Sequence, residues 1–198
     1  IHIDLAGDPL WVRDFATADQ KGAAALAFCS DHGLELHRNY ILSFLATSAL
    51  DQGRWDDAVD WADEFFRVPR QTTSPRMLAL TVVGLVRARR GDPDPWSPLD
   101  EAYELGVFSG EVPRMFRPAA ARAEAAWLEG RDAEIGELTE HAYRLAVERR
   151  SGEAVGALGM WRRRVGLPVD LIDEVEDWHG RLELGGECVP IAACLDAR

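Results

Sequence analysis

The stretch of sequence that decides the fold is Leu50-Asp51-Gln52-Gly53-Arg54-Trp55-Asp56. The residues before Gly53 have the apolar spacing of an amphipathic helix. Those after it open a second helix with acidic residues in the first turn, where they interact favourably with the helix dipole. The stretch therefore predicts two helices joined by a tight turn at Gly53.

The same signal recurs along the chain. Glycines close helical stretches at Gly53, Gly91, Gly130 and Gly166, with spacings of 38, 39 and 36 residues. Leu5-Ala6-Gly7-Asp8-Pro9 is a further, truncated copy. Recurrence at this period is typical of a solenoid of helical hairpins.

Periodicity, prolines and glycines together predict an all-α protein. Loops are expected at 68–75, 91–98 and 107–113, and Pro118 is placed in the first turn of its helix, where proline is tolerated. Ile1-His2-Ile3-Asp4-Leu5 alternates like a strand but is better explained, in register with the other units, as the tail of a severed helix. The expected helices are 18–32, 36–52, 55–67, 74–90, 96–106, 114–129, 133–150, 152–165 and 170–184.

The repeating units resemble tetratricopeptide repeats (TPRs). The second unit matches with Leu80, Gly84 and Gly91, and the third, more weakly, with Ala123, Ala126, Gly130 and Ala142. The resemblance covers about 36–166 and implies a right-handed superhelix of antiparallel helix hairpins. We expect a single domain over 1–198, with degenerate end units at about 1–35 and 167–198. The first full unit carries the closest match, through Leu42, Leu45, Ala46, Ala49, Gly53, Trp55, Ala58 and Pro69.

A narrower resemblance is to the C-terminal helical region of large bacterial ATP-binding regulators of the LuxR-type or MalT-like class. It implies a sensor arm beside an ATPase domain and a DNA-binding domain of the same parent chain. The residues that carry it are the runs 53–58, 74–76, 84–93 and 119–128.

Composition excludes several classes of protein. The net charge of −12 makes direct nucleic-acid binding by this segment a poor prospect, since such binding needs cations. No apolar run approaches the roughly 20 residues that cross a bilayer. Three cysteines are too few and too irregular for a disulfide framework, which favours a cytoplasmic protein. The start at Ile1 indicates a piece of a longer chain, and Cys188–Cys194 is expected to pack at its end.

Ten side chains are candidates for binding a partner or effector. In TPR-like stacks the first helix of each hairpin lines the concave surface. Carrying this rule over to the predicted first helices of the chain, position by position, selects side chains with hydroxyl, guanidinium, carboxylate and aromatic groups. Such a row suits polar contacts to a peptide or a small molecule, although ordinary solvated residues would look the same. The candidates are Tyr40, Ser43, Thr47, Thr81, Arg89, Arg117, Glu124, Trp127, Glu153 and Arg163.

Catalytic, cofactor and metal motifs are not expected. The sequence has no phosphate-binding loop, no nucleophile elbow and no zinc-protease motif, and its histidines are scattered. The acidic set within 56–64 is interpreted as a solvated helix face, with paired catalytic carboxylates as the alternative. The tryptophans at 55, 61, 127 and 161 are interpreted as packing between repeats, with an aromatic binding groove as the alternative.

These observations favour a non-catalytic interaction or effector-sensing scaffold within a bacterial signalling or transcriptional regulator. One alternative is a structural or dimerisation arm without a ligand, which a large exposed apolar patch would favour. A second is a helical-bundle enzyme that uses buried carboxylates.

Overall fold

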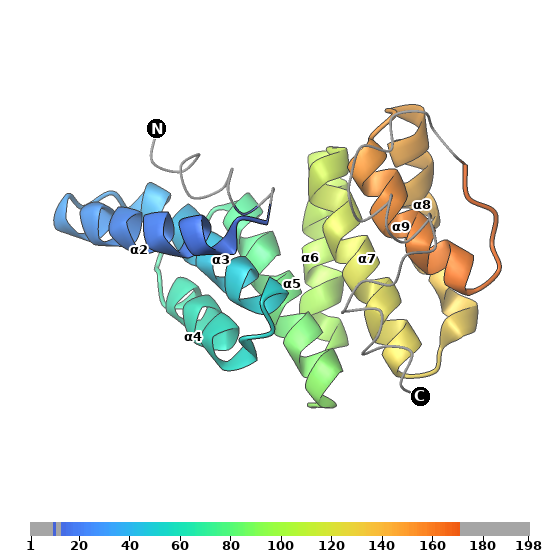
Figure 1. Ribbon diagram of the computed structural model, residues 1–198, viewed down its shortest axis with the longest axis horizontal. Coiled ribbons are helices and arrows are strands. Elements are labelled where there is room, and N and C mark those ends of the chain that lie inside the picture. The colour runs from blue at the N-terminus through green and yellow to red at the C-terminus, as the bar shows by residue number, and fades with distance from the viewer. Residues whose placement is uncertain (1–9, 11–12, 171–198) are drawn as a thin grey trace. The chain divides into compact units, whose positions relative to one another are not determined.

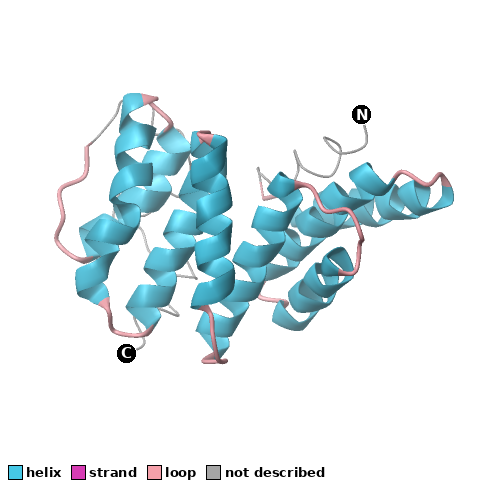
Figure 2. Cartoon of the chain, turned by 180° about the vertical axis from the view of Figure 1, so that it is seen from behind, coloured by secondary structure: helices cyan, strands magenta, loops and turns pink. Residues whose placement is uncertain are grey.

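The all-α class is confirmed. The computed structural model describes residue 10 and residues 13–170 (Figure 1). These residues form eight α-helices and one short 3-10 helix, and no strand occurs among them (Figure 2). The elements are α2 (Phe15–Asp31), α3 (Glu35–Asp51), α4 (Trp55–Phe66), α5 (Thr73–Arg90), α6 (Trp96–Ser109), α7 (Val112–Leu128), η1 (Asp132–Glu134), α8 (Ile135–Glu148) and α9 (Gly152–Arg164).

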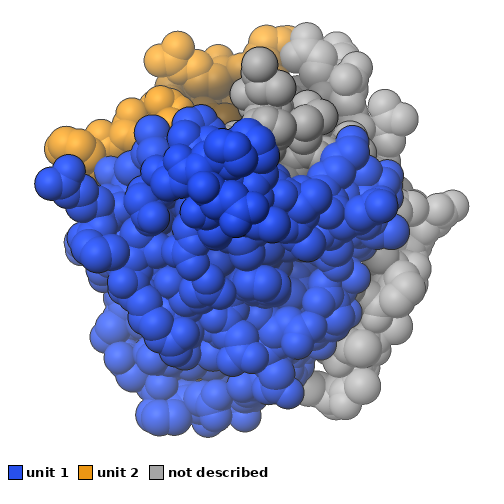
Figure 3. Space-filling view, turned by 90° about the vertical axis from the view of Figure 1, so that its left-hand side faces the viewer, with its two compact units in different colours: residues 1–105 blue, residues 106–198 orange. Residues whose placement is uncertain are grey.

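The chain divides into two compact units, residues 1–105 and 106–198 (Figure 3). In unit 1, α3 packs against α2, α4 and α5, and α4 also packs against α5. In unit 2, α7 packs against α8 and α9, and α8 also packs against α9. Both units thus contain a helix that contacts the next two helices along the chain.

The turns predicted at the repeat glycines are confirmed. Gly53, Gly91, Gly130 and Gly166 all have positive φ values, between 72° and 76°, which residues with a Cβ rarely adopt. The residue after each glycine donates its backbone N–H to the carbonyl five residues earlier, at 2.8–2.9 Å. This bond satisfies a carbonyl that the end of the helix leaves without a partner. The glycines therefore end the first helix of each hairpin and start the turn.

The predicted loop before α7 and the predicted place of Pro118 in that helix are both wrong. The loop expected at 107–113 is much shorter, because α6 continues to Ser109 and α7 begins at Val112. Pro113 takes the first turn of α7, so Pro118 lies in the helix interior and is buried, rather than in the first turn. Proline lacks an N–H, so Pro118 cannot donate to the carbonyl of Arg114 four residues earlier. Gly106 of α6 lies against that same carbonyl.

Several predictions fall outside the described residues. They are the helix tail at Ile1–Leu5, most of the helix expected at 170–184, and the terminal packing of Cys188–Cys194. Helix α2 begins at Phe15, three residues before the predicted start at residue 18. Asp14 caps it, because its side chain accepts a hydrogen bond from the backbone N–H of Thr17.

The core of unit 1 lies between the helices that flank α3. Ile41 and Leu45 of α3 pack with Ala25 of α2, and the half-buried Trp61 of α4 packs against this cluster. Phe65 of α4 is fully buried. One face of α4 therefore belongs to the core. Across the described part of the chain, no helix is both long and apolar enough to cross a membrane.

Asp94 carries a testable pH dependence. Its carboxylate accepts hydrogen bonds from the backbone N–H and the hydroxyl of Ser97, at 3.1 and 2.7 Å, in the first turn of α6. These bonds, with a smaller contribution from the charge of Arg87, hold the pKa of Asp94 below its ordinary value. A lowered folded-state pKa means that the stabilisation is present above the unfolded-state pKa of about 4 and is lost as the pH falls through the folded-state pKa.

We therefore expect the Tm of Asp94→Asn to fall less than the Tm of the wild type between pH 5 and pH 3. Thermal unfolding followed by circular dichroism measures this. Asp92→Asn is the control, because the Asp92 carboxylate makes no hydrogen bond or ion pair within the described residues. An equal change in both variants would assign the effect to net charge instead.

Candidate functional site

The candidate residues of unit 1 are divided between the core and the surface. Ser43, Thr47 and Thr81 are buried. Their hydroxyls donate to carbonyls of their own helices, those of Tyr40, Ser43 and Met77, at 2.9, 2.8 and 2.8 Å. Groups buried and bonded in this way do not line an open surface, so their placement does not support direct contact with a ligand.

Tyr40 and Arg89 remain at the surface of unit 1. Both are half-buried. The rings of Tyr40 and Phe44 meet edge to face, with their centroids 6.2 Å apart. Tyr40 lies on α3 and Arg89 near the end of α5, and these two helices pack against each other.

The candidates of unit 2 lie on α7 and α9. Arg117 forms an ion pair with Glu153, so two predicted residues from neighbouring helices meet. Trp127 lies beside Trp161, with ring centroids 6.1 Å apart, and the Arg164 guanidinium is 5.5 Å from one ring and 5.4 Å from the other.

The remaining predicted residues of unit 2 are Glu124, half-buried on α7, and Arg163, exposed on α9. The predicted residues of unit 2 thus take part in two separate contacts, the Arg117–Glu153 ion pair and the packing of Trp127 beside Trp161 and Arg164.

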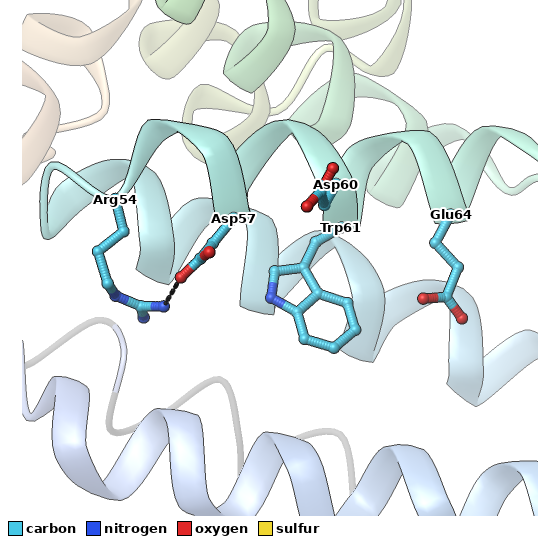
Figure 4. A pocket seen from close by; sticks show the side chains of 5 residues that line it. All are labelled: Arg54, Asp57, Asp60, Trp61 and Glu64. Atoms are coloured by element: carbon cyan, nitrogen blue, oxygen red, sulfur yellow. Dashed lines mark hydrogen bonds and ion pairs between the residues drawn. The ribbon is translucent and has the colours of Figure 1, made fainter.

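The groove of unit 1 lies elsewhere, on α4. It encloses about 440 Å³ and is lined by Arg54, Asp57, Asp60, Trp61 and Glu64. Figure 4 shows Asp57, Trp61 and Glu64 extending from the same side of α4. These residues follow the spacing of three, four and seven that places side chains on one face of a helix. The α4 groove is therefore built by one face of one helix, with a tryptophan in its middle.

Ion pairs hold the two ends of the α4 groove. At one end, Arg54 contacts both Asp57 and Asp19 of α2 at 2.6 Å. The Asp19 carboxylate also accepts hydrogen bonds from Ser48 at 2.6 Å and from Gln52 at 3.1 Å, so it ties α2 to α3 and to the start of α4. At the other end, Arg38 of α3 donates to Glu64. Both arginines are thus occupied within the chain.

Asp60 lies between these two ends. It is exposed and makes no hydrogen bond or ion pair with any described residue. The groove therefore combines an aromatic wall with a carboxylate that lacks a counter-ion in the described chain. Such a surface can attract a cation, since an indole face and a carboxylate both favour positive charge.

The sequence pattern does not identify the α4 groove as a binding site. The acidic residues of this helix fit a solvated face, and Trp61 fits packing between repeats. The spacing of Asp57, Asp60, Trp61 and Glu64 was the available signal, because it places all four on one helical face. What the sequence could not show is that α2 and α3 supply the partners Asp19 and Arg38.

No family model, no curated protein and no solved structure matches the chain. Within the described residues, no three side chains of the His, Cys, Asp and Glu types come together as a metal site.

Proposed function

We propose that the helices form a right-handed superhelix of TPR-like antiparallel hairpins. The packing within each unit supports this. In unit 1, α3 contacts both its hairpin partner α4 and the next first helix α5, and in unit 2, α7 contacts α8 and α9 in the same way. The four repeat glycines Gly53, Gly91, Gly130 and Gly166 all have positive φ and recur at the similar spacings of 38, 39 and 36 residues. A stack of hairpins produces this alternation, because each hairpin buries its apolar face on the next.

We infer that the chain is a non-catalytic scaffold that binds a protein partner or a small effector. The α4 groove carries this inference, because it is an open groove of about 440 Å³ with charged and aromatic walls. Binding would bias the activity of a larger regulator through different affinities for two states. The resemblance to ATP-binding LuxR-type or MalT-like regulators supports a regulator of bacterial signalling, with ATPase and DNA-binding domains as proposed neighbours.

A structural or dimerisation arm is the second candidate. Phe108, near the end of α6, is 90% exposed, and its neighbour Val107 is also exposed. An exposed apolar pair of this kind can be covered by a second copy of a chain.

Site-specific photo-crosslinking tests the proposed function. Benzoylphenylalanine replaces Arg89 on the first-helix face or Asp57 in the α4 groove, in cells that express the full protein. Lys21 and Glu148, which are exposed and belong to neither surface, are the control positions. We expect an adduct with a different protein, or protection by an effector, at Arg89 or Asp57 and not at the controls. Adducts only with a second copy of the chain would support the dimerisation arm, and no adduct above the controls would contradict the scaffold.

A further inference from the structure

The carboxylates of α4 are unevenly neutralised. The helix contains five acidic residues and no basic one. Arginines from other segments pair with three of them: Arg90 with Asp56, Arg54 with Asp57, and Arg38 with Glu64. The other two, Asp60 and Asp63, have no partner among the described residues. Of this pair, Asp60 lines the groove and Asp63 does not.

Trp61 provides the second feature of the site. Its indole lies in the groove wall beside Asp60, and packing against Ala25, Ile41 and Leu45 holds it in place. A ring held in this way offers a face at little cost in side-chain entropy. The groove therefore has a fixed aromatic surface next to an unneutralised carboxylate.

Other aromatic rings of the described chain have an arginine side chain lying over them. Arginine guanidiniums lie over aromatic rings at distances of 4.5–5.7 Å, as Arg162 does over Tyr143 and Arg164 over Trp127 and Trp161. Trp61 has no such arginine among the described residues. Arg54 and Arg38, the two arginines nearest along the groove, are held by carboxylates instead.

We propose that the α4 groove binds an arginine side chain of a basic peptide segment in a partner protein. The guanidinium stacks on Trp61 and donates hydrogen bonds to Asp60. Charge complementarity supports this occupant, since the chain carries a net charge of −12 and the groove has a surplus of carboxylates. Arginine suits the site better than lysine, because its planar group can stack and donate at the same time.

This inference rests on the proposed scaffold function and names the class of its partner. A single exposed arginine contributes little binding free energy, so we expect an affinity in the millimolar range for a short probe. Longer basic segments gain affinity through several contacts at once.

NMR titration of the full chain tests the inference. The probe is N-acetyl-Gly-Arg-Gly-amide, and the matched probe carries citrulline, a neutral group of nearly the same shape, in place of arginine. The indole N–H signal of Trp61, assigned from the spectrum of Trp61→Phe, reports on the groove. We expect this signal to shift saturably as the arginine probe is added. The same shift should need at least a 10-fold higher concentration of the citrulline probe.

Two matched variants separate the site from general acidity. Asp60→Asn should weaken binding of the arginine probe at least 5-fold, because it removes the acceptor charge beside Trp61. Asp63→Asn removes the same charge from the same helix outside the groove, and should change the affinity less than 2-fold. Equal losses in the two variants, equal binding of the two probes, or no shift of the Trp61 signal would each overturn the inference.

The crosslinking experiment distinguishes failure of this site from failure of the scaffold. If the probe does not bind but Arg89 yields an adduct with another protein, the arginine site is wrong and the scaffold stands. If neither experiment detects binding, both are wrong.

Discussion

Replacing Phe65 by alanine is expected to lower the free energy of unfolding by about 4 kcal/mol, within the range measured for buried phenylalanines. Phe65 is fully buried in α4, and its ring meets that of Phe66 with a centroid distance of 5.3 Å. Alanine removes the apolar contacts of the ring and leaves a cavity. The helices around it fill this cavity only in part, because α4 is held against α3 and α5. Because the same helix carries the groove, we also expect the Trp61 signal to lose its response to the arginine probe.

Urea unfolding followed by tryptophan fluorescence measures this change. Phe108→Ala is the matched control, because it removes the same side chain from a position that is 90% exposed. Its expected effect is below about 0.5 kcal/mol. Similar losses in the two variants would contradict the assignment of α4 to the core.

Replacing Gly106 by alanine is expected to cost about 2 kcal/mol or more, as overpacking does when the neighbouring atoms cannot move. A Cβ at Gly106 would lie 2.5 Å from the carbonyl oxygen of Arg114 and 3.1 Å from the Cα of Met115. Both are backbone atoms of α7, so relief requires α6 and the first turns of α7 to separate. This loss exceeds the gain in helix propensity from glycine to alanine, which is about 1 kcal/mol.

Gly136→Ala is the control for Gly106→Ala. It is also a helical glycine of unit 2, but its Cβ would meet only the end of the flexible Leu167 side chain, at 3.0 Å. We expect a change near zero or a small gain in Tm. If the two variants unfold at the same denaturant concentration, the close approach of α6 and α7 is contradicted.

The hairpin pattern could be predicted from the sequence because local chemistry determines it. Glycine at positive φ, acidic first turns and apolar spacing are all short-range signals, and the turn at Gly53 follows from them. Pro118 is not the first-turn proline, because α7 begins at Val112 and Pro113, an equally suitable proline five residues earlier, takes that place. The sequence offers two prolines that suit a first turn, and their pattern alone does not distinguish them.

The candidate site could be predicted only in part. Positions transferred from TPR-like repeats do not give the exposure of each side chain: Ser43, Thr47 and Thr81 are predicted on a surface and are buried. Exposure depends on how closely two helices approach, which the pattern of one helix does not contain. The α4 groove depends in the same way on Asp19 and Arg38, which are distant in the sequence.

A binding surface shared by all hairpins requires the two units to stack as one array. Gln52, Arg90, Glu129 and Val165 immediately precede the four repeat glycines and are therefore equivalent positions. Spin labels at these positions, in a chain whose native cysteines are replaced by alanine, allow dipolar EPR distances between successive repeats to be compared. The pairs 52–90 and 129–165 lie within units and serve as internal references. A TPR-like superhelix predicts that the pair 90–129 gives the same narrow distance distribution as the references, whereas a broad or clearly longer distribution would contradict it.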